Sequence, residues 1–292
     1  MKVLVFGSKG WIGSMFSSAS HHTIIAAKTR PENYEECLKE ISDIRPDSVI
    51  SFIGRTHGEN IPTIDYLELP GKLHENMRDN FIAPRNLAEM CWTLSIHFVY
   101  LGTGCIYTYT ADKKIFTEED IPNFFGSSYS IMKGYTDQEL RRYATTLQLR
   151  IRMPISRYSN PRNLINKLIS YKNICSIENS MTVLDDMMPI IDTMIEQRTT
   201  GTFNLTNPGT INHVNILEQY KQYHDSSHSW TDVSYEEQMK HIKSHRSNNE
   251  LSTIKLNNYC KKNNLELLPI RESFSRCIGY FNSSLPHETH TI

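Results

Sequence analysis

The sequence contains no long uncharged run of apolar residues and no large excess of charge of either sign. Its 292 residues include 31 Lys and Arg against 32 Asp and Glu, and 39% of them are hydrophobic. A transmembrane helix needs about 20 predominantly apolar residues, so none is expected. A balanced charge creates no field that recruits nucleic acid or an anionic membrane surface. We therefore expect no nucleic-acid partner and no membrane partner.

The six cysteines and twelve histidines lack the spacings of disulfide frameworks and zinc sites. No CxxC pair occurs, so reduced thiols and a cytoplasmic location are expected. The adjacent His21 and His22 are more typical of a loop than of a ligand pair, and no metal chemistry is expected. The first residues enter a strand pattern at once, without the features of a secretory signal. The length allows one or two domains with a large core.

A glycine-rich turn follows the first predicted strand, residues 2–6. The glycines at positions 7, 10 and 13 form a GxxGxxG pattern ahead of a plausible helix. Glycine permits a tight turn and the close approach of a pyrophosphate, whose charge is bound by free amides at a helix N-terminus. The pattern alone is weak, but its place directly after the first strand predicts a dinucleotide site. That site comprises Gly7, Ser8, Gly10, Trp11, Ile12 and Gly13.

The end of the second predicted strand, residues 23–27, indicates which dinucleotide binds. An NAD site places an acidic residue here, which bonds the ribose 2′-hydroxyl. This chain instead continues Lys28-Thr29-Arg30, and two cations suit a 2′-phosphate. Lys28 and Arg30 could alternatively be solvated loop charges. We favour NADP(H) as the cofactor.

Strand and helix patterns alternate through the first half of the chain. Helical spacing over residues 34–44 precedes a strand and turn over 47–54, and Ile53, Gly54 and Thr56 should lie near the nicotinamide. A long helix around Asn80 follows, then a strand over 97–103, a helix from Lys133 to about residue 145, and a strand over 147–152. This alternation predicts an α/β fold with a doubly wound parallel sheet.

The pattern changes after Pro154, which is assigned to the cofactor site. A helix is predicted to start at residues 160–163, and short helices and strands follow. We expect an NADP-binding domain over residues 1–154 and a smaller mixed α/β substrate lobe over 155–292, from which residues 201–209 return to the main sheet.

Polar side chains follow the predicted central strand. Thr103 and Cys105 come at its carboxyl end, where ligands bind in open α/β sheets. Tyr129 and Lys133 share one face of a helix, and a nearby ammonium lowers the pKa of a phenol, making it a proton donor and acceptor. A Tyr/Lys pair at this spacing is by itself usually an ordinary surface pair. With the dinucleotide turn, the set predicts an active site.

Eight motifs together resemble one family, and they lie at 7–13, 104–107, 129–133, 152–156, 160–163, 179–185, 204–209 and 246–250. It is the bifunctional UDP-4-keto-6-deoxyglucose 3,5-epimerase/4-reductase, the last part of UDP-L-rhamnose synthase, within the extended short-chain dehydrogenases; GDP-fucose synthase is a related family. The Asn-, Ile- and Lys-rich composition is similar to that of a giant-virus version, and this resemblance implies a location in the host cytoplasm. The eight motifs occur in the family's order along the chain.

The resemblance implies 3,5-epimerisation and then reduction of a 4-keto sugar. Thr103 and Tyr129 would hold the C4 oxygen, with Lys133 beside them, although Thr103 stands where relatives usually carry Ser. Cys105 can reach an adjacent carbon, and Lys167 matches the second member of the acid/base pair. From residues alone, Cys105 could be an inert buried thiol and Lys167 a solvated helix position.

Further substrate contacts and partners are also implied by the resemblance. Each contact could instead serve packing or capping. A UDP-sugar substrate, an upstream 4,6-dehydratase that supplies it and a homodimer are expected. Two other hypotheses are a reductase alone, similar to dTDP-4-dehydrorhamnose reductase, and a non-catalytic NADP-binding regulator. The implied substrate contacts are Thr103, Gly104, Cys105, Tyr129, Asn163, Met181, Thr182, Val183, Arg246 and Asn249.

Overall fold

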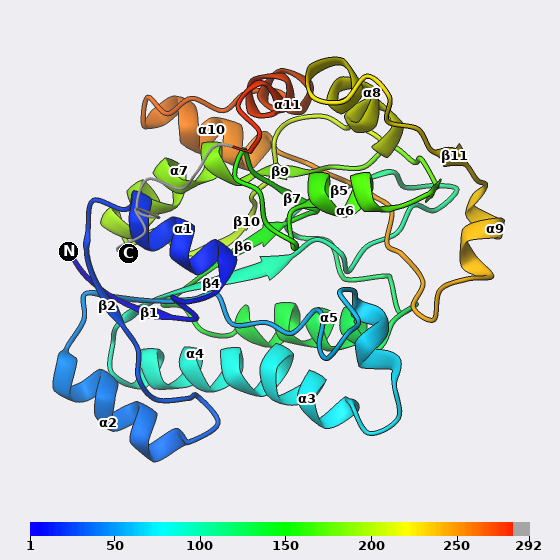
Figure 1. Ribbon diagram of the computed structural model, residues 1–292. Coiled ribbons are helices and arrows are strands. Elements are labelled where there is room, and N and C mark those ends of the chain that lie inside the picture. The colour runs from blue at the N-terminus through cyan, green and yellow to red at the C-terminus, as the bar shows by residue number, and fades with distance from the viewer. Residues whose placement is uncertain (283–292) are drawn as a thin grey trace, which may run out of the picture.

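The computed structural model describes residues 1–282, and a parallel sheet of six strands forms its centre (Figure 1). The strands run in the order β10-β6-β4-β3-β1-β2. The chain passes from β1 to β2 on one side and returns to β3 on the other, which opens a crevice for a ligand beside β1. The predicted doubly wound sheet is confirmed. The bounds are β1 Lys2–Phe6, β2 Thr23–Ala26, β3 Ser48–Ser51, β4 His97–Thr103, β6 Thr146–Ile151 and β10 Gly201–Asn204.

Helices cover both faces of the sheet. Side chains alternate along β1, so that Leu4 and Phe6 pack toward one layer and Val3 and Val5 toward the other. Strands buried on both faces are apolar throughout, which is why they stand out in the sequence as continuous apolar runs. The first layer contains α2 (Tyr34–Ile44), α4 (Ala83–Thr93) and α5 (Ser128–Leu140), and the second contains α1 (Trp11–Ala19), α7 (Leu184–Glu196) and α10 (Ile254–Lys262) (Figure 1).

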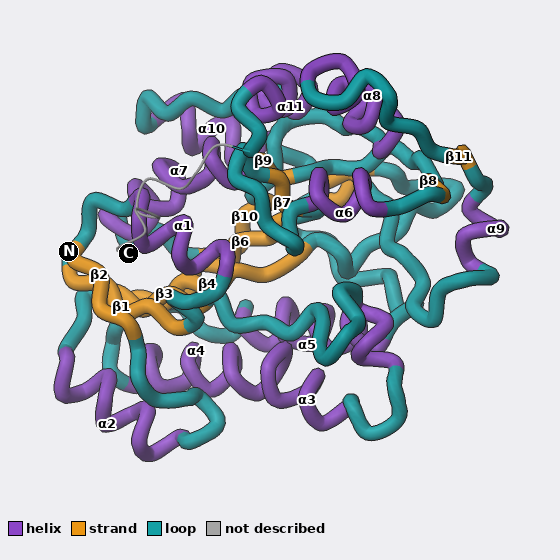
Figure 2. The backbone as a smooth tube through the Cα atoms, viewed as in Figure 1, coloured by secondary structure: helices purple, strands orange, loops and turns teal. Residues whose placement is uncertain are grey.

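The elements that form a second, smaller hydrophobic core lie beyond the carboxyl ends of the strands (Figure 2). It forms where α6 (Leu164–Ser170), α8 (His213–Tyr223) and α11 (Ile270–Gly279) pack around the pair β7 (Pro154–Ile155) and β9 (Thr182–Val183). Two more short pairs and one helix complete this region. They are β8 (Asn173–Ile174) with β11 (Thr231–Asp232), β5 (Ile115–Phe116) with β12 (Glu250–Leu251), and α9 (Tyr235–Met239).

The last strand of the sheet comes from the second half of the chain. β10 pairs with β6 in parallel, with Phe203 opposite Leu149. Helices α7 and α10 of the same half contribute to the core that covers β1 and β4. The division into units at residues 154 and 155 stays a prediction. Among residues 1–282, no helix is long and apolar enough to cross a membrane.

Three helices differ from the predicted ones. The predicted long helix is α3 (Leu73–Met77), a π-helical turn (Arg78–Ile82) and α4. The helix expected to reach residue 145 ends at Leu140, because two successive tight turns, Tyr143 N to Leu140 O and Thr146 N to Tyr143 O, lead into β6. The helix expected from residue 160 starts at Leu164, because Asn163 caps it instead.

Candidate active site

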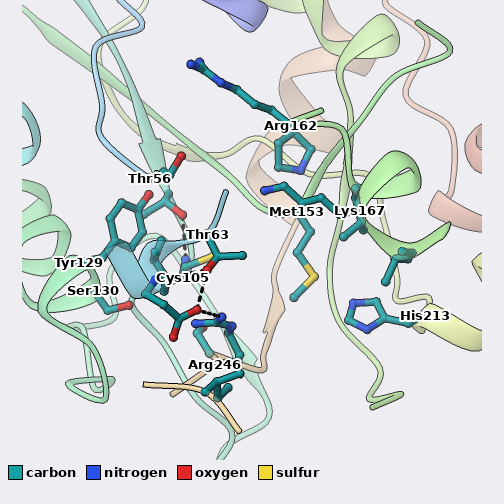
Figure 3. A pocket seen from close by; sticks show the side chains of 18 of the residues that line it. Thr56, Thr63, Cys105, Tyr129, Ser130, Met153, Arg162, Lys167, His213 and Arg246 are labelled. Carbon is teal, nitrogen blue, oxygen red and sulfur yellow. Dashed lines mark hydrogen bonds and ion pairs between the residues drawn. The ribbon is translucent and has the colours of Figure 1, made fainter. Parts of the chain in front are cut away.

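A cavity of about 850 Å³ opens at the carboxyl ends of the central strands (Figure 3). It extends from the glycine-rich turn after β1, past the ends of β4 and the start of α5, to α6 and residues 241–248. The predicted turn, the hydroxyl and thiol after β4, the Tyr/Lys pair and Lys167 therefore meet in one space. This position beside β1 is the one that the strand order predicts for a ligand.

The glycine-rich turn has the backbone that a pyrophosphate requires. Gly7 has φ +78°, and the Gly10 amide donates to the Gly7 carbonyl at 3.0 Å. A Cβ at Gly13 would lie 2.2 Å from that carbonyl oxygen, so only glycine fits where α1 packs against the turn. Gly10, Trp11, Ile12 and Gly13 line the cavity, whereas Gly7 and Ser8 do not. The residues present thus fit a dinucleotide at the N-terminus of α1.

The remaining predicted cofactor residues divide into two groups. Ile53, Gly54, Thr56 and Pro154 line the cavity with Tyr129 and Lys133. Lys28 and Arg30 do not line it. Their loop is held by Glu40 of α2, which accepts hydrogen bonds from the Lys28 amide at 2.8 Å and the Thr29 amide at 2.9 Å. The Arg30 side chain is 68% exposed and pairs with Glu32 at 3.2 Å.

Tyr129 is buried next to the two groups that follow β4. Its phenol shares a hydrogen bond with the Thr103 side chain, and the Cys105 amide donates to the Thr103 hydroxyl at 3.0 Å. The sequence predicted that Lys133 lowers the pKa of Tyr129. That prediction is wrong, because burial, with Cys105 as a second cause, raises the pKa of Tyr129 and outweighs the hydrogen bond with Thr103.

Lys133 faces a different partner from the one expected. Its ammonium donates to the Tyr100 hydroxyl at 2.7 Å and lies 5.9 Å from the centre of the Tyr129 ring. Burial lowers the pKa of Lys133 to about 7, against the opposing charge of Asp79. A lysine that is half neutral near pH 7 exerts only part of the electrostatic effect on Tyr129 that a full charge would exert.

Lys167 lines the cavity instead of a solvated helix face. In Figure 3 it lies on the opposite side from Tyr129 and Cys105. Burial lowers the pKa of Lys167, and the nearby cations Arg246 and Arg162 lower it further. A lysine with a lowered pKa can accept a proton near neutrality.

Arg246 lines the cavity as predicted, but several other predicted substrate residues do not. Asn163 is fully buried, where it accepts from the Ile165 amide and donates to the Ser156 carbonyl at 2.6 Å. Asn249 is also fully buried and donates to the Gly104 carbonyl at 3.0 Å. The side-chain amides of Asn163 and Asn249 therefore stabilise the backbone behind the cavity wall.

The other four predicted contacts are absent from the cavity lining for packing reasons. Met181, Thr182 and Val183 lie in and beside β9, at most 1% exposed, where the Thr182 hydroxyl donates to the Leu205 carbonyl at 2.9 Å. Gly104 lies against the Leu251 side chain, which is 2.5 Å from the position of a Cβ. We find no support in this geometry for a substrate contact at these positions.

Residues that the sequence reasoning missed also line the cavity. They include Asp65, Met153, Arg162 and His213. Arg162 and Met153 lie inside motifs that carry the family resemblance, so they could have been identified by considering every polar or flexible position of those motifs as a candidate site residue. Asp65 lies in an irregular, proline-flanked stretch whose sequence carries no such signal.

A separate side-chain group lies away from this cavity. His21 and His22 form the turn before β2, and their ring nitrogens and the Asp192 carboxylate lie within 4.8 Å of one another. Atoms at that spacing could share a metal ion, which the sequence did not predict. Asp192 already accepts from the Ser20 hydroxyl at 2.7 Å and the His21 amide at 3.0 Å, so the group ties this turn to α7.

The fold and the site define a dinucleotide-dependent enzyme with a hydroxyl, a phenol and a lysine at the end of its central strand. The chain belongs to the NAD dependent epimerase/dehydratase family, whose model matches residues 3–170. The family membership and the nicotinamide-dinucleotide cofactor that the sequence predicted are thereby confirmed.

Among known proteins, the chain is similar to protein L780 of Acanthamoeba polyphaga mimivirus, with 50% identity over 264 residues that cover 88% of this chain and 91% of that protein. The crystal structure of L780, described as a UDP-rhamnose synthase, matches with a TM-score of 0.92 and 46% identity, over 96% of this chain and 99% of that chain. This relative agrees with the giant-virus resemblance seen in the sequence.

Two proteins of Arabidopsis thaliana are also similar. A bifunctional dTDP-4-dehydrorhamnose 3,5-epimerase/dTDP-4-dehydrorhamnose reductase is 36% identical, over 94% of this chain and 91% of that protein. A trifunctional UDP-glucose 4,6-dehydratase/UDP-4-keto-6-deoxy-D-glucose 3,5-epimerase/UDP-4-keto-L-rhamnose-reductase is 38% identical over 94% of this chain, which spans only 41% of that protein.

Proposed function

We propose that this protein converts UDP-4-keto-6-deoxy-D-glucose to UDP-L-rhamnose by 3,5-epimerisation followed by NADPH-dependent reduction at C4. The observation that carries the proposal is the meeting of Cys105 and Lys167 with Thr103 and Tyr129 in the cavity that begins at the dinucleotide turn. The similarity to L780 and to the Arabidopsis bifunctional enzyme supports both halves of the reaction.

Epimerisation needs a base and an acid at carbons next to a carbonyl. The C3 and C5 protons of a 4-keto sugar are acidic because the C4 oxygen takes up the charge of the resulting enolate. Lys167, with its lowered pKa, and Cys105 lie on opposite sides of the cavity, as inversion requires (Figure 3). One removes the proton from one face and the other returns a proton to the opposite face.

Reduction uses the hydroxyl groups at the end of β4 and the start of α5. Bound NADPH supplies a hydride to C4. Tyr129 donates the proton to the C4 oxygen, and its raised pKa keeps the phenol protonated until negative charge develops there. Thr103 bonds the phenol and orients it toward that oxygen. The Lys133 nitrogen lies 5.9 Å from the centre of the Tyr129 ring, and in its protonated form it stabilises the phenolate that forms as the proton leaves.

The diphosphate of the substrate is bound by cations at the far side of the cavity. Arg246, Arg162 and Lys167 line this region, and the two arginines are close enough to lower the pKa of Lys167. For the cofactor, we propose NADPH over NADH, with Lys28 and Arg30 turning to the 2′-phosphate. Glu40 accepts its hydrogen bonds from the backbone amides of this loop, so the side chains of Lys28 and Arg30 are not tied to a buried group and can turn toward the phosphate.

We also propose the biological setting from the same chemistry. A 4,6-dehydratase activity supplies the 4-keto sugar, an activity that the name of the trifunctional Arabidopsis relative includes. The protein acts as a homodimer in the cytoplasm, or in the host cytoplasm if it is viral.

The decisive experiment incubates the protein with UDP-4-keto-6-deoxyglucose and NADPH and determines the product by NMR. UDP-L-rhamnose is expected. A product reduced at C4 with unchanged C3 and C5 would instead indicate a reductase alone. No NADPH consumption would contradict the reduction, and recovery of an unchanged substrate would contradict both activities. Because the names of relatives include both UDP and dTDP sugars, the dTDP substrate is measured in parallel, with a lower kcat/KM expected.

A further inference from the structure

Residues 61–69, the bridge segment, lie between two parts of the active site. Its centre is a 3-10 turn, Ile64–Glu68. Tyr66 and Leu67 are buried in one cluster with Tyr129, against which Cys105 also packs. The apolar side of the bridge segment is therefore fixed on the side chains that carry the proposed chemistry.

The polar side of the bridge segment is fixed on a distant part of the chain through Asp65. Its carboxylate accepts from the Lys243 amide at 2.9 Å, from the Ser244 amide and hydroxyl, both at 2.9 Å, and from the Arg246 guanidinium. The Thr63 hydroxyl donates to it at 2.6 Å. Burial favours a higher pKa for Asp65, but these hydrogen bonds outweigh it and hold the pKa far below its usual range.

The same turn holds the start of helix α5. Glu68 accepts from the Ser128 amide at 2.7 Å and from the Ser128 hydroxyl at 3.0 Å. Ser128 directly precedes Tyr129. One short turn thus joins the segment that carries Arg246 to the helix that carries the proposed proton donor.

We propose that Asp65 is a positioning residue for the reaction, which holds Arg246 and residues 243–246 at the cavity wall in the arrangement that receives the diphosphate of the substrate. The proposal rests on the proposed function only for the identity of the ligand. A group that is already ordered binds without losing further conformational freedom. Without Asp65, the guanidinium and two amides lose their shared acceptor, and binding must order them.

Charge and positioning predict opposite effects of removing this carboxylate. Asp65 places a negative charge against Arg246, so by charge alone its neutralisation strengthens the binding of an anion. If positioning dominates, neutralisation weakens that binding. The direction of the change in affinity therefore separates the two effects.

The experiment measures UDP binding to Asp65→Asn by calorimetry. The two carboxylate oxygens accept from different donors, one from residues 243 and 244 and the other from Arg246. The amide of Asn keeps only one acceptor and must point its own donor at one of these two sets, so Kd should rise about tenfold, the size of a lost charge-assisted network. Glu59→Gln is the matched control, since Glu59 pairs with Lys72 at 2.8 Å near the surface, and its Kd should equal that of the wild type. An unchanged or lower Kd in Asp65→Asn would overturn the proposal.

A double-mutant cycle distinguishes positioning from a general structural role. If Asp65 acts through Arg246, adding Asp65→Asn to Arg246→Gln should raise Kd by less than about twofold, because the group it holds is already gone. An undiminished tenfold rise in that background would contradict the proposal. If Asp65→Asn does not fold, Ser244→Ala is measured instead. It removes one donor to Asp65 and one acceptor for Arg246 from the same network, and it should give a smaller rise.

Hydrogen exchange tests the same contact without any ligand. Amide exchange over residues 243–246 should be faster in Asp65→Asn than in the wild type, while β1 should be unchanged. Equal exchange in both proteins would overturn the proposal. If the wild type bound no UDP, the nucleotide assignment of the proposed function would fail, and hydrogen exchange would still decide the role of Asp65.

Discussion

Proton exchange at C3 and C5 gives the sharpest test of the Cys105 and Lys167 assignments. Lys167→Arg keeps a cation at this position beside Arg246 and Arg162, so binding of the diphosphate should survive. A guanidinium does not release its proton, however, and cannot serve as the base. Lys167→Arg and Lys167→Ala should therefore lose exchange to the same degree, by about 10²–10⁴-fold, the usual contribution of one acid or base.

Cys105→Ser should have a comparable effect, because a hydroxyl is a far weaker acid than a thiol. The assay follows deuterium incorporation from D₂O into the 4-keto sugar by NMR, and needs no turnover of NADPH. One substitution could spare exchange at one carbon, which would identify the base acting there. Reduction of a substrate already in the L-configuration should persist, since Tyr129 and Thr103 are intact.

The pH dependence gives a second signature of Lys167. Its lowered pKa leaves more neutral amine near neutrality than an ordinary lysine has. Exchange should fall as pH falls through this pKa, because the amine becomes protonated and stops accepting. The residual exchange of Lys167→Ala should lack this acidic decline. Deuterium incorporation at the wild-type rate in Lys167→Ala and Cys105→Ser would refute the reasoning.

Three other outcomes are expected. Tyr129→Phe removes the proton donor and keeps the ring, so the steady-state reduction rate should fall by about 10²–10⁴-fold, and near-normal turnover would exclude Tyr129. NADPH should give a higher kcat/KM than NADH, and replacing Lys28 and Arg30 together by Ser should remove the difference; equal values in the wild type would contradict the assignment. The buried Arg150 donates to both Asp137 oxygens, at 2.7 and 2.8 Å. Asp137→Ala leaves this buried cation without its carboxylate, so it should lower the free energy of unfolding by about 3–5 kcal/mol in urea titrations. An unchanged unfolding midpoint would contradict this expectation.

Local patterns predicted the parts of the site that a single strand and its following turn create. The glycine-rich turn and the Thr103 and Cys105 positions each follow an apolar strand, and the sheet places the ends of such strands together. The Asp65 contact with Arg246 joins residues 181 positions apart, one in a short 3-10 turn and the other in irregular chain, so no periodicity in the sequence indicates it.

The wrong expectations have a related cause. A motif identifies residues that are important for function, but it does not show whether a residue contacts the ligand or stabilises the backbone behind the cavity wall. Asn163 stands directly before a helix and caps it, a role that its residue type and position favour without any ligand. The pKa of Tyr129 depended on how deeply its ring is buried, which the Tyr/Lys spacing does not reveal.

The placement of β10 beside β6 has a consequence for how the chain is made. During synthesis, β6 leaves the ribosome more than 50 positions before β10, as the strand bounds imply. Until β10 arrives, the backbone donors and acceptors along the open edge of β6 have no partner, and such an edge is a template for pairing with another nascent chain. A fragment that stops at residue 154 should therefore aggregate when expressed, and its solubility should be restored by supplying residues 155–292 as a separate polypeptide in the same cell.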